Sequence, residues 1–246
     1  MSVTLGVDVG GTGIKAALVD TSTGELLSDR FRCDTPRHST PEAVRDAAAQ
    51  LCRRAGFGNL DRVGMALPGV VRGGALRTAT NLDDSWIGAP LHDVFADWAD
   101  SITFLNDADA AAIAEAEFGA ARGVPGLTAM VTLGTGIGVG LLFDGTLIPN
   151  CELGQLEING RMAESFASAR AMELGGLFWA EWAYGVSIYL SKLELVINPD
   201  LIIIGGGVVQ TPDTWFPRLR ATAELRLARL SKSAGIVGAA MAARKA

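Results

Sequence analysis

Apolar and polar residues alternate along the first part of the chain, which predicts β-strands separated by tight turns. The alternation breaks at Gly10-Gly11 and at Thr23-Gly24, and the second break is typical of a hairpin. Thr40-Pro41 supplies the N-cap and the first position of a helix. The pattern predicts strands over 3–9, 14–19, 25–33, 62–67 and 102–105, and helices from 41 to about 54 and from 108 to 118.

The second half of the chain repeats this pattern. A strand leads into a glycine turn at 134–138, and Asp144-Gly145 marks the next hairpin. Apolar residues recur at helical spacing between Trp179 and Ile197, and Asn198-Pro199 ends that helix. The predicted strands are 128–133, 139–143 and 201–204, and the last helix is 234–243. Because strands alternate with helices in two similar halves, the sequence predicts an α/β protein.

Glycine is concentrated at the turns of this pattern. Of 30 glycines in 246 residues, four lie in 6–13, four in 134–140 and three in 205–207. Glycine lets backbone N–H groups approach a phosphate closely, because no Cβ atom intervenes. The nucleotide-binding pattern GxxxxGK[ST] and the dinucleotide pattern GxGxxG are both absent from the sequence. The turns therefore predict a phosphate site of another type.

Composition narrows the class of protein further. A hydrophobic content of 49% with 20% charged residues predicts a folded core, and the net charge of −6 argues against a nucleic-acid or anionic-membrane surface. The start of the chain lacks the features of a signal peptide, and no apolar stretch reaches membrane-spanning length. Cys33, Cys52 and Cys151 are far apart, which fits neither a disulfide framework nor a zinc pair. We expect buried thiols and a cytoplasmic protein.

Two turns carry side chains that suit phosphate binding. The segment 8–15 (DVGGTGIK) combines a carboxylate for a metal, a Thr hydroxyl and a Lys, and the segment 133–138 (LGTGIG) has a matching Thr. Two such hairpins that face each other across a cleft would hold a polyphosphate from both sides. The alternative is that both segments are tight hairpin turns without a ligand.

Six segments give the chain a resemblance to a known family. DVGGTGIKAALVD, VGMALPGVV, FLNDADAAAIAE, TLGTGIGVGLLFDG, ELGQLEI and PDLIIIGGGVV have the order and spacing of the ROK family of sugar kinases, in the actin-like ATPase superfamily. RTATNLDDSWIG and AGIVGAA are most similar to the bacterial polyphosphate glucokinases. The resemblance implies two actin-like (ribonuclease H-like) α/β domains with mixed β-sheets flanked by helices and a cleft between them. The expected domains are 1–108 with 235–246, and 109–234.

The resemblance also implies an activity, a set of site residues and a homodimer. Polyphosphate or ATP would donate a phosphoryl group to the 6-hydroxyl of glucose, or of mannose, with Mg²⁺ as cofactor and Asp107 as general base. The implied sugar-binding residues are Asn81, Asn106, Asp107, Glu152, Gln155 and Glu164. The implied donor-binding residues are Asp8, Gly10, Gly11, Thr12, Lys15, Gly134, Thr135, Gly136, Gly206 and Gly207, with Asp8 also as a magnesium ligand.

Several of these residues have simpler interpretations. Asp107 precedes a predicted helix and could be its N-cap. Asn81, Glu152 and Glu164 could be ordinary polar surface residues. Met172 and the pair Trp179 and Trp182 are interpreted as core or dimer-interface residues rather than as a base-stacking site.

The chain departs from the family pattern at two places. Gln155 stands where the family has a histidine, and LEINGRMA (156–163) contains no cysteine, so we expect no structural zinc. The segment 209–212 (VQTP) lacks the lysines that polyphosphate glucokinases carry there, which leaves ATP open as the donor. The scattered cations that could replace those lysines are Lys15, Arg72, Arg77, Lys192 and Lys232.

Two other functions were weighed against the kinase. ROK-type transcriptional repressors carry a helix-turn-helix before the first motif, and here that motif begins at Asp8. A catalytically impaired sugar-binding or sensor protein is suggested by Gln155, whereas the presence of Asp107 and Lys15 favours a kinase.

Overall fold

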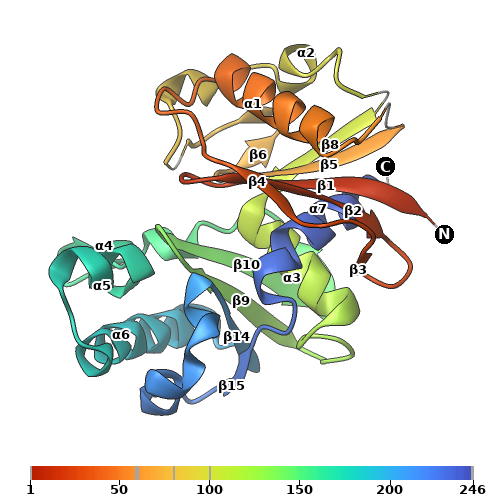
Figure 1. Ribbon diagram of the computed structural model, residues 1–246. Helices are drawn as coiled ribbons and strands as arrows, with labels where there is room; N and C mark the ends of the chain where they lie inside the picture. The colour runs from red at the N-terminus through yellow and green to blue at the C-terminus, as the bar shows by residue number, and fades with distance from the viewer. Residues whose placement is uncertain (1, 59–60, 80, 100, 245–246) are drawn as a thin grey trace. The chain divides into compact units, whose positions relative to one another are not determined.

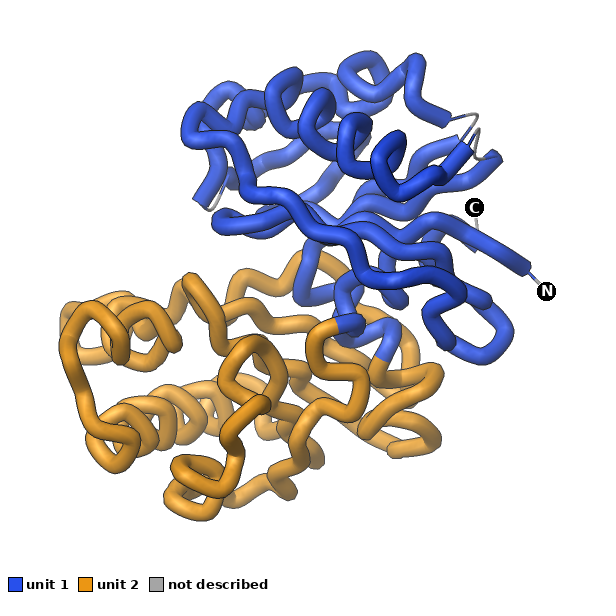
Figure 2. Tube along the Cα trace, in the orientation of Figure 1, with its two compact units in different colours: residues 1–114, 233–246 blue, residues 115–232 orange. Residues whose placement is uncertain are grey.

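The computed structural model describes residues 2–58, 61–79, 81–99 and 101–244. It divides into two compact units, which Figure 2 shows in different colours. Unit 1 comprises residues 1–114 and 233–246, and unit 2 comprises residues 115–232. Each unit is built on one mixed β-sheet, and the ribbon in Figure 1 labels the elements of both.

The sheet of unit 1 combines a hairpin with parallel strands. β1 pairs antiparallel with β2 over seven residue pairs and parallel with β5, which pairs parallel with β8. The strand order is β3 (Glu25–Leu26), β2 (Ile14–Asp20), β1 (Val3–Val9), β5 (Arg62–Leu67) and β8 (Ser101–Asn106), with β4 (Phe31–Cys33) also paired to β2.

Helices cover both faces of this sheet (Figure 1). α1 (Pro41–Arg54) packs on the face to which Leu5, Val7 and Val9 point, and the side chain of Thr40 accepts a hydrogen bond from the N–H of Ala43 as its N-cap. α7 (Ala234–Arg244) packs against β1 and β5 on the other face. The remaining elements are β6 (Val71–Arg72), β7 (Ala75–Leu76), α2 (Leu91–Val94), α3 (Asp107–Phe118) and a 3-10 turn at Asp84–Trp86.

Glycines in the strands let α7 lie close to the sheet. A Cβ atom at Gly6 would collide with the carbonyl of Ile236, and one at Gly64 would collide with the carbonyl of Ala239. Neither glycine has a positive φ, so the requirement at both positions is space for the helix. The even-numbered residues of β1, which include Asp8, therefore face α7.

Unit 2 repeats the sheet of unit 1. Its strand order is β11 (Thr146–Ile148), β10 (Ile137–Phe143), β9 (Leu127–Leu133), β14 (Leu201–Gly206) and β15 (Glu224–Leu227), with two antiparallel pairs followed by two parallel pairs. α6 (Trp179–Ile197) covers the sheet, and its core includes the buried rings of Trp182 and Trp215. Shorter elements are β12 (Glu157–Ile158), β13 (Arg161–Met162), α4 (Glu164–Ala167), α5 (Ala169–Gly175) and 3-10 turns at Leu153–Gln155, Gly207–Gln210, Pro212–Thr214, Phe216–Arg218 and Ser231–Ser233.

The α/β class and the two related halves are confirmed, whereas one strand was predicted wrongly. The expected strand 25–33 is broken into β3 and β4, and the hydroxyl of Ser28 accepts the hydrogen bond of the Leu18 N–H in the gap. The strand predicted from 139 begins two residues earlier, at Ile137. Among the described residues, no helix has the length and apolar character needed to cross a membrane.

Candidate active site

The carboxylate of Asp8 forms an ion pair at the end of β1. Nζ of Lys15, directly opposite on β2, lies 2.8 Å from Oδ2 of Asp8, and the two side chains are only 30% and 16% exposed, respectively. The first turn of α7 closes over this pair, because a Cβ atom at Gly235 would lie 3.0 Å from Cγ of Asp8. The fold therefore fixes a carboxylate and an ammonium group beside the first glycine turn, which comprises residues 10–13.

The turn itself is closed by backbone hydrogen bonds. The N–H of Gly10 donates to the carbonyl of Gly13 at 3.0 Å, and the hydroxyl of Thr35 donates to the carbonyl of Gly10 at 2.5 Å. Asn81 is exposed and has φ +64°. It lies against Gly11, because a Cβ atom added at Gly11 would be 2.8 Å from the Cβ of Asn81. The structure thus brings together residues that were predicted to bind the donor and the sugar.

Arg32 also lies at this turn and is not among the predicted site residues. Its Nη2 donates to the carbonyl of Thr12 at 3.0 Å, and a Cβ atom at Gly13 would lie 2.7 Å from its Nε. One signal was available in the sequence: Phe31 and Cys33 are apolar, so Arg32 between them must point to the opposite face of the sheet.

Asn106 and Asp107 lie at the junction of β8 and α3. Oδ1 of buried Asn106 accepts hydrogen bonds from the N–H groups of Ala108 and Asp109 at 2.9 and 3.0 Å, so Asn106 is the helix N-cap. Its Nδ2 donates to the carbonyl of Gly69 at 3.1 Å. Asp107 is the first residue of α3 and is partly exposed, with Oδ1 2.8 Å from the N–H of Ala108. Capping by Asn106 fixes the position from which the Asp107 carboxylate projects.

The second glycine turn (residues 134–136) and the third (residues 206–207) lie side by side in unit 2. The N–H of Gly134 donates to the carbonyl of Gly136 at 3.0 Å. Gly206 pairs with Leu133 in register and has φ +91°, and a Cβ atom there would collide with the carbonyl of Leu133. Gly207 borders open space. Glycine at 206 is thus required both by its φ and by the close approach of β9.

An acidic side chain lies at the second turn, and a second one lies near it. A Cβ atom at Gly136 would lie 2.6 Å from Oε2 of Glu164, so that carboxylate rests on the turn. Burial, and secondarily the charge of Glu164, raises the pKa of Glu152 above its usual value. Gln155 follows in the same segment, and its N–H donates to the carbonyl of Glu152 at 3.0 Å. This segment packs on β10, because a Cβ atom at Gly154 would collide with the carbonyl of Ile137.

The donor groups of unit 1 suit a magnesium ion bound with a substrate. Mg²⁺ in phosphoryl-transfer sites is held by one or two carboxylates together with substrate phosphates. Asp8, at the first glycine turn, offers one such carboxylate. Within the described part of the chain, no three His, Cys, Asp or Glu side chains gather as a metal site. The single carboxylate of Asp8 fits a magnesium ion whose other ligands are phosphate oxygens.

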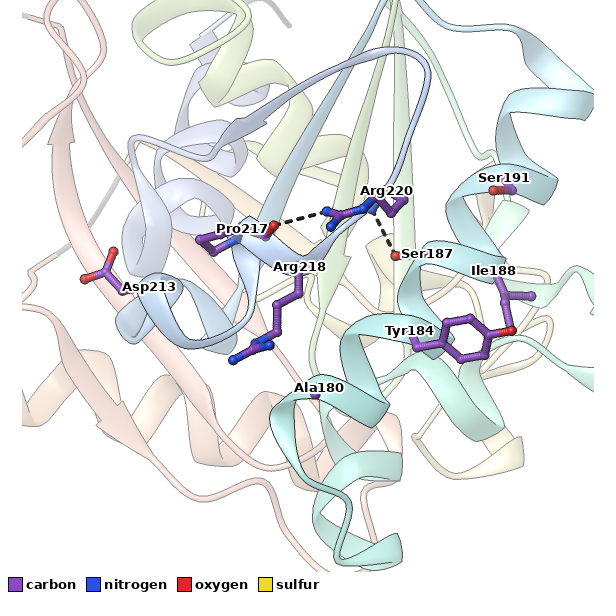
Figure 3. A pocket seen from close by; sticks show the side chains of 9 residues that line it. All are labelled: Ala180, Tyr184, Ser187, Ile188, Ser191, Asp213, Pro217, Arg218 and Arg220. Atoms are coloured by element: carbon purple, nitrogen blue, oxygen red, sulfur yellow. Dashed lines mark hydrogen bonds between the residues drawn. The ribbon is translucent and has the colours of Figure 1, made fainter.

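An open pocket of about 730 Å³ lies between α6 and the turns at 212–218 (Figure 3). Tyr184 and Ile188 of α6 line one side, and Arg218 and Arg220 line the other. The N–H of Arg220 donates to the hydroxyl of Ser187 at 3.0 Å. The nine residues of its lining include none of the residues that the sequence predicted for the site.

Comparison with known proteins identifies similar chains. The model of the ROK family matches residues 4–154. A polyphosphate glucokinase of Mycobacterium tuberculosis (strain CDC 1551 / Oshkosh) is 44% identical over 239 residues, which are 96% of this chain and 89% of the relative. The structure of an inorganic polyphosphate/ATP-glucomannokinase from Arthrobacter sp. strain KM is 41% identical with a TM-score of 0.95, and all of both chains is covered. A ROK family glucokinase from Streptomyces griseus, in complex with glucose and AMPPNP, is 27% identical with a TM-score of 0.86, again over all of both chains.

Proposed function

The chain belongs to the ROK family, and from that membership we infer that it is a sugar kinase, which transfers a phosphoryl group from inorganic polyphosphate or ATP to the 6-hydroxyl of glucose. The observation that carries this inference is the 44% identity with a polyphosphate glucokinase over 96% of the chain. The similar glucomannokinase is described as using both donors, and its name adds mannose as a second sugar. These relatives favour the kinase over a catalytically impaired sugar-binding protein.

Unit 1 supplies the proton acceptor in this proposal. The oxygen of the sugar hydroxyl attacks the terminal phosphorus of the donor, its proton passes to the carboxylate of Asp107, and the bond to the shortened donor breaks. Asn106 is a sugar ligand in this proposal and also a positioning residue, because the two hydrogen bonds that its Oδ1 accepts fix the start of α3. Asn81 is exposed beside the first turn, and its amide forms a hydrogen bond with a sugar hydroxyl in this proposal.

Unit 2 supplies acceptors for the sugar hydroxyls. Glu152, Gln155 and Glu164 provide carboxylate and amide oxygens, and a hexose presents several hydroxyl donors to such groups. Donor phosphates bind backbone N–H groups and Thr hydroxyls at the glycine turns, with Lys15 as a cation. The partners in this proposal are therefore a hexose and a polyphosphate or nucleotide donor.

Mg²⁺ is the proposed cofactor, with Asp8 as its ligand from the chain. When it is bound, the ion neutralises charge on the phosphate oxygens of the donor. Lys15 already faces Asp8 at 2.8 Å, so ion binding requires the carboxylate to share its charge between two cations. We place the reaction in the cytoplasm, where such phosphoryl donors are present.

We also propose that two copies of the chain form a homodimer through α5 and α6. Large apolar side chains are unusually exposed there: Leu174, Phe178 and Leu195 are each 78% exposed, and Tyr184 is 70% exposed. An exposed apolar surface of this kind is characteristic of a protein interface. The pocket in Figure 3 borders the same surface through Tyr184. Sedimentation equilibrium at several concentrations tests the proposal, and a monomer at all of them overturns it.

Substitution of Asp107 tests the proposed function. Asp107→Asn keeps the size of the side chain and removes its basicity, so kcat should fall by about a hundredfold or more. Formation of hexose 6-phosphate is measured with glucose or mannose and Mg²⁺, and polyphosphate and ATP are supplied separately.

Asp29→Asn is the matched control, because Asp29 is exposed and lies in unit 1 outside the site. It should keep the activity of the unmodified protein. Equal kcat values for Asp107→Asn and Asp29→Asn would refute the role of Asp107. Absence of product with either donor would favour the sugar-binding alternative.

A further inference from the structure

Three charged side chains form a row across the sheet of unit 1. Asp8 on β1 lies opposite Lys15 on β2, and Lys15 lies opposite Arg32 on β4. Residues directly opposite each other in antiparallel strands share a face of the sheet. All three side chains are therefore on the face that α7 covers at Gly235.

The guanidinium group of Arg32 is seated against the first glycine turn. Nη2 donates to the carbonyl of Thr12, and Nε, Nη2 and Cζ occupy the space that a Cβ atom at Gly13 would need, at 2.7, 2.9 and 3.0 Å. Gly13 does not have a positive φ, so its backbone conformation does not require glycine. The missing side chain at residue 13 instead makes room for Arg32.

The two cations at this turn differ in how firmly they are held. Lys15 pairs with Asp8 in a partly buried position. Arg32 pairs with Asp34 at 2.8 Å, but these side chains are 50% and 84% exposed. Exposed ion pairs contribute little to stability, so Arg32 can exchange this partner at small cost. A guanidinium group binds phosphate oxygens through two parallel N–H donors, which suits it to such an exchange.

From this geometry we propose that Arg32 is a ligand of the phosphoryl donor, which binds a phosphate oxygen beside the turn 10–13 in exchange for Asp34. The ligand class is a chain of linked phosphates, as in polyphosphate or the triphosphate of ATP. The inference rests on the proposed function and adds a cation that the pattern of lysines in related enzymes does not indicate. Asp34 acts as an internal competitor for the guanidinium group.

Substitutions at 32 and 34 should act in opposite directions. Arg32→Ala should raise the donor KM about tenfold or more, as expected when a hydrogen bond to a charged group is lost. Arg32→Lys should recover part of this loss, and Asp34→Asn should lower the donor KM. The KM for glucose and the thermal midpoint should stay unchanged in these variants. Arg53→Ala is the control, because Arg53 is an exposed arginine in the last turn of α1, and all its values should equal those of the unmodified protein.

Gly13→Ala gives an independent test because it displaces the guanidinium group without removing it. Gly13→Ala should raise the donor KM, and the double variant with Arg32→Ala should be no worse than Arg32→Ala alone. Additive effects of the two substitutions would show that Gly13 acts by another route. An unchanged donor KM in Arg32→Ala, or an equal rise in the glucose KM, would overturn the proposal.

Calorimetric binding of tripolyphosphate separates this inference from the proposed function, because it requires no turnover. If no donor gives product but tripolyphosphate binding is weakened by Arg32→Ala, the site stands and the kinase activity fails. If product forms and the affinity for tripolyphosphate is the same in both proteins, the role of Arg32 fails and the kinase stands.

Discussion

The first and second glycine turns join similar hairpins but differ in the charged side chains around them. Each turn joins two antiparallel strands that pair over seven residues. A 3.0 Å hydrogen bond between backbone groups closes each turn. Lys15 and Arg32 lie at the first turn, paired with the carboxylates of Asp8 and Asp34, respectively. The carboxylate of Glu164 rests on the second, with Glu152 near enough for the Glu164 charge to raise its pKa.

This difference shows that a repeated hairpin does not imply a repeated function. A glycine turn can present backbone N–H groups to a phosphate, but the neighbouring side chains decide which ligand each turn favours. Cations favour the phosphates of the donor at the first turn. Carboxylates favour the hydroxyl donors of a sugar at the second. The proposed phosphate binding at the second turn would occur against the repulsion of Glu164.

Loss of a side chain at each turn tests this asymmetry most directly. Lys15→Ala removes a cation and leaves the charge of Asp8 unbalanced beside the donor, so kcat/KM for the donor should fall about a hundredfold. Thr135→Ala removes one uncharged donor to a phosphate oxygen and leaves no charge unbalanced, so a smaller loss, of about tenfold, is expected. Steady-state kinetics with varied donor measures both. Equal losses in the two variants would contradict the asymmetry.

Removing the charge of Glu164 at the second turn should produce smaller effects, which are opposite in sign for the donor KM and the glucose KM. Glu164→Gln keeps the shape of the side chain and removes the charge against Gly136, so the donor KM should fall a few-fold. The glucose KM should rise, because an amide oxygen is a weaker acceptor than a carboxylate. Glu157→Gln, an exposed substitution in the same unit, is the control. A rise in both KM values would show that Glu164 does not oppose the donor.

The smallest expected effect is a dependence of stability on pH. The pKa of Glu152 is higher in the folded chain than in the unfolded chain, so its stabilising contribution is complete below the unfolded pKa and is lost as pH rises through the folded pKa. Glu152→Gln should therefore gain stability relative to the unmodified protein as pH rises above the usual pKa of a glutamate. Urea unfolding midpoints at several pH values measure this. A constant difference across those pH values would exclude the effect.

Much of the fold could be predicted from local sequence patterns. The helix at Pro41–Arg54 begins at the predicted N-cap, and the helix at Trp179–Ile197 has the predicted bounds, because both have caps and long apolar periodicity. The strand predicted over 25–33 failed because alternation alone does not show where a strand leaves its partner, as it does at Ser28. Elements of two to four residues, such as β12 and α4, are too short to have a period.

The candidate site was less predictable than the fold. Motif spacing identified Asp8, Lys15 and Asp107, because their neighbours in the chain carry the pattern. Arg32 was missed because its relation to the turn depends on the register of β4 on β2, which is a contact between distant parts of the chain. The charge of Glu164 at the second turn was missed for the same reason. The roles of the predicted residues remain predictions.

The position of α7 in the sequence has a consequence for synthesis on the ribosome. Residues 1–114 emerge first, but the positions beside Gly6 and Gly64 stay open until Ile236 and Ala239 are made. Unit 2 is one continuous segment, 115–232, and can fold before then. At typical translation rates the intervening residues take roughly 6 to 24 s. The half of the molecule that is translated first is therefore completed last, when α7 packs on its sheet.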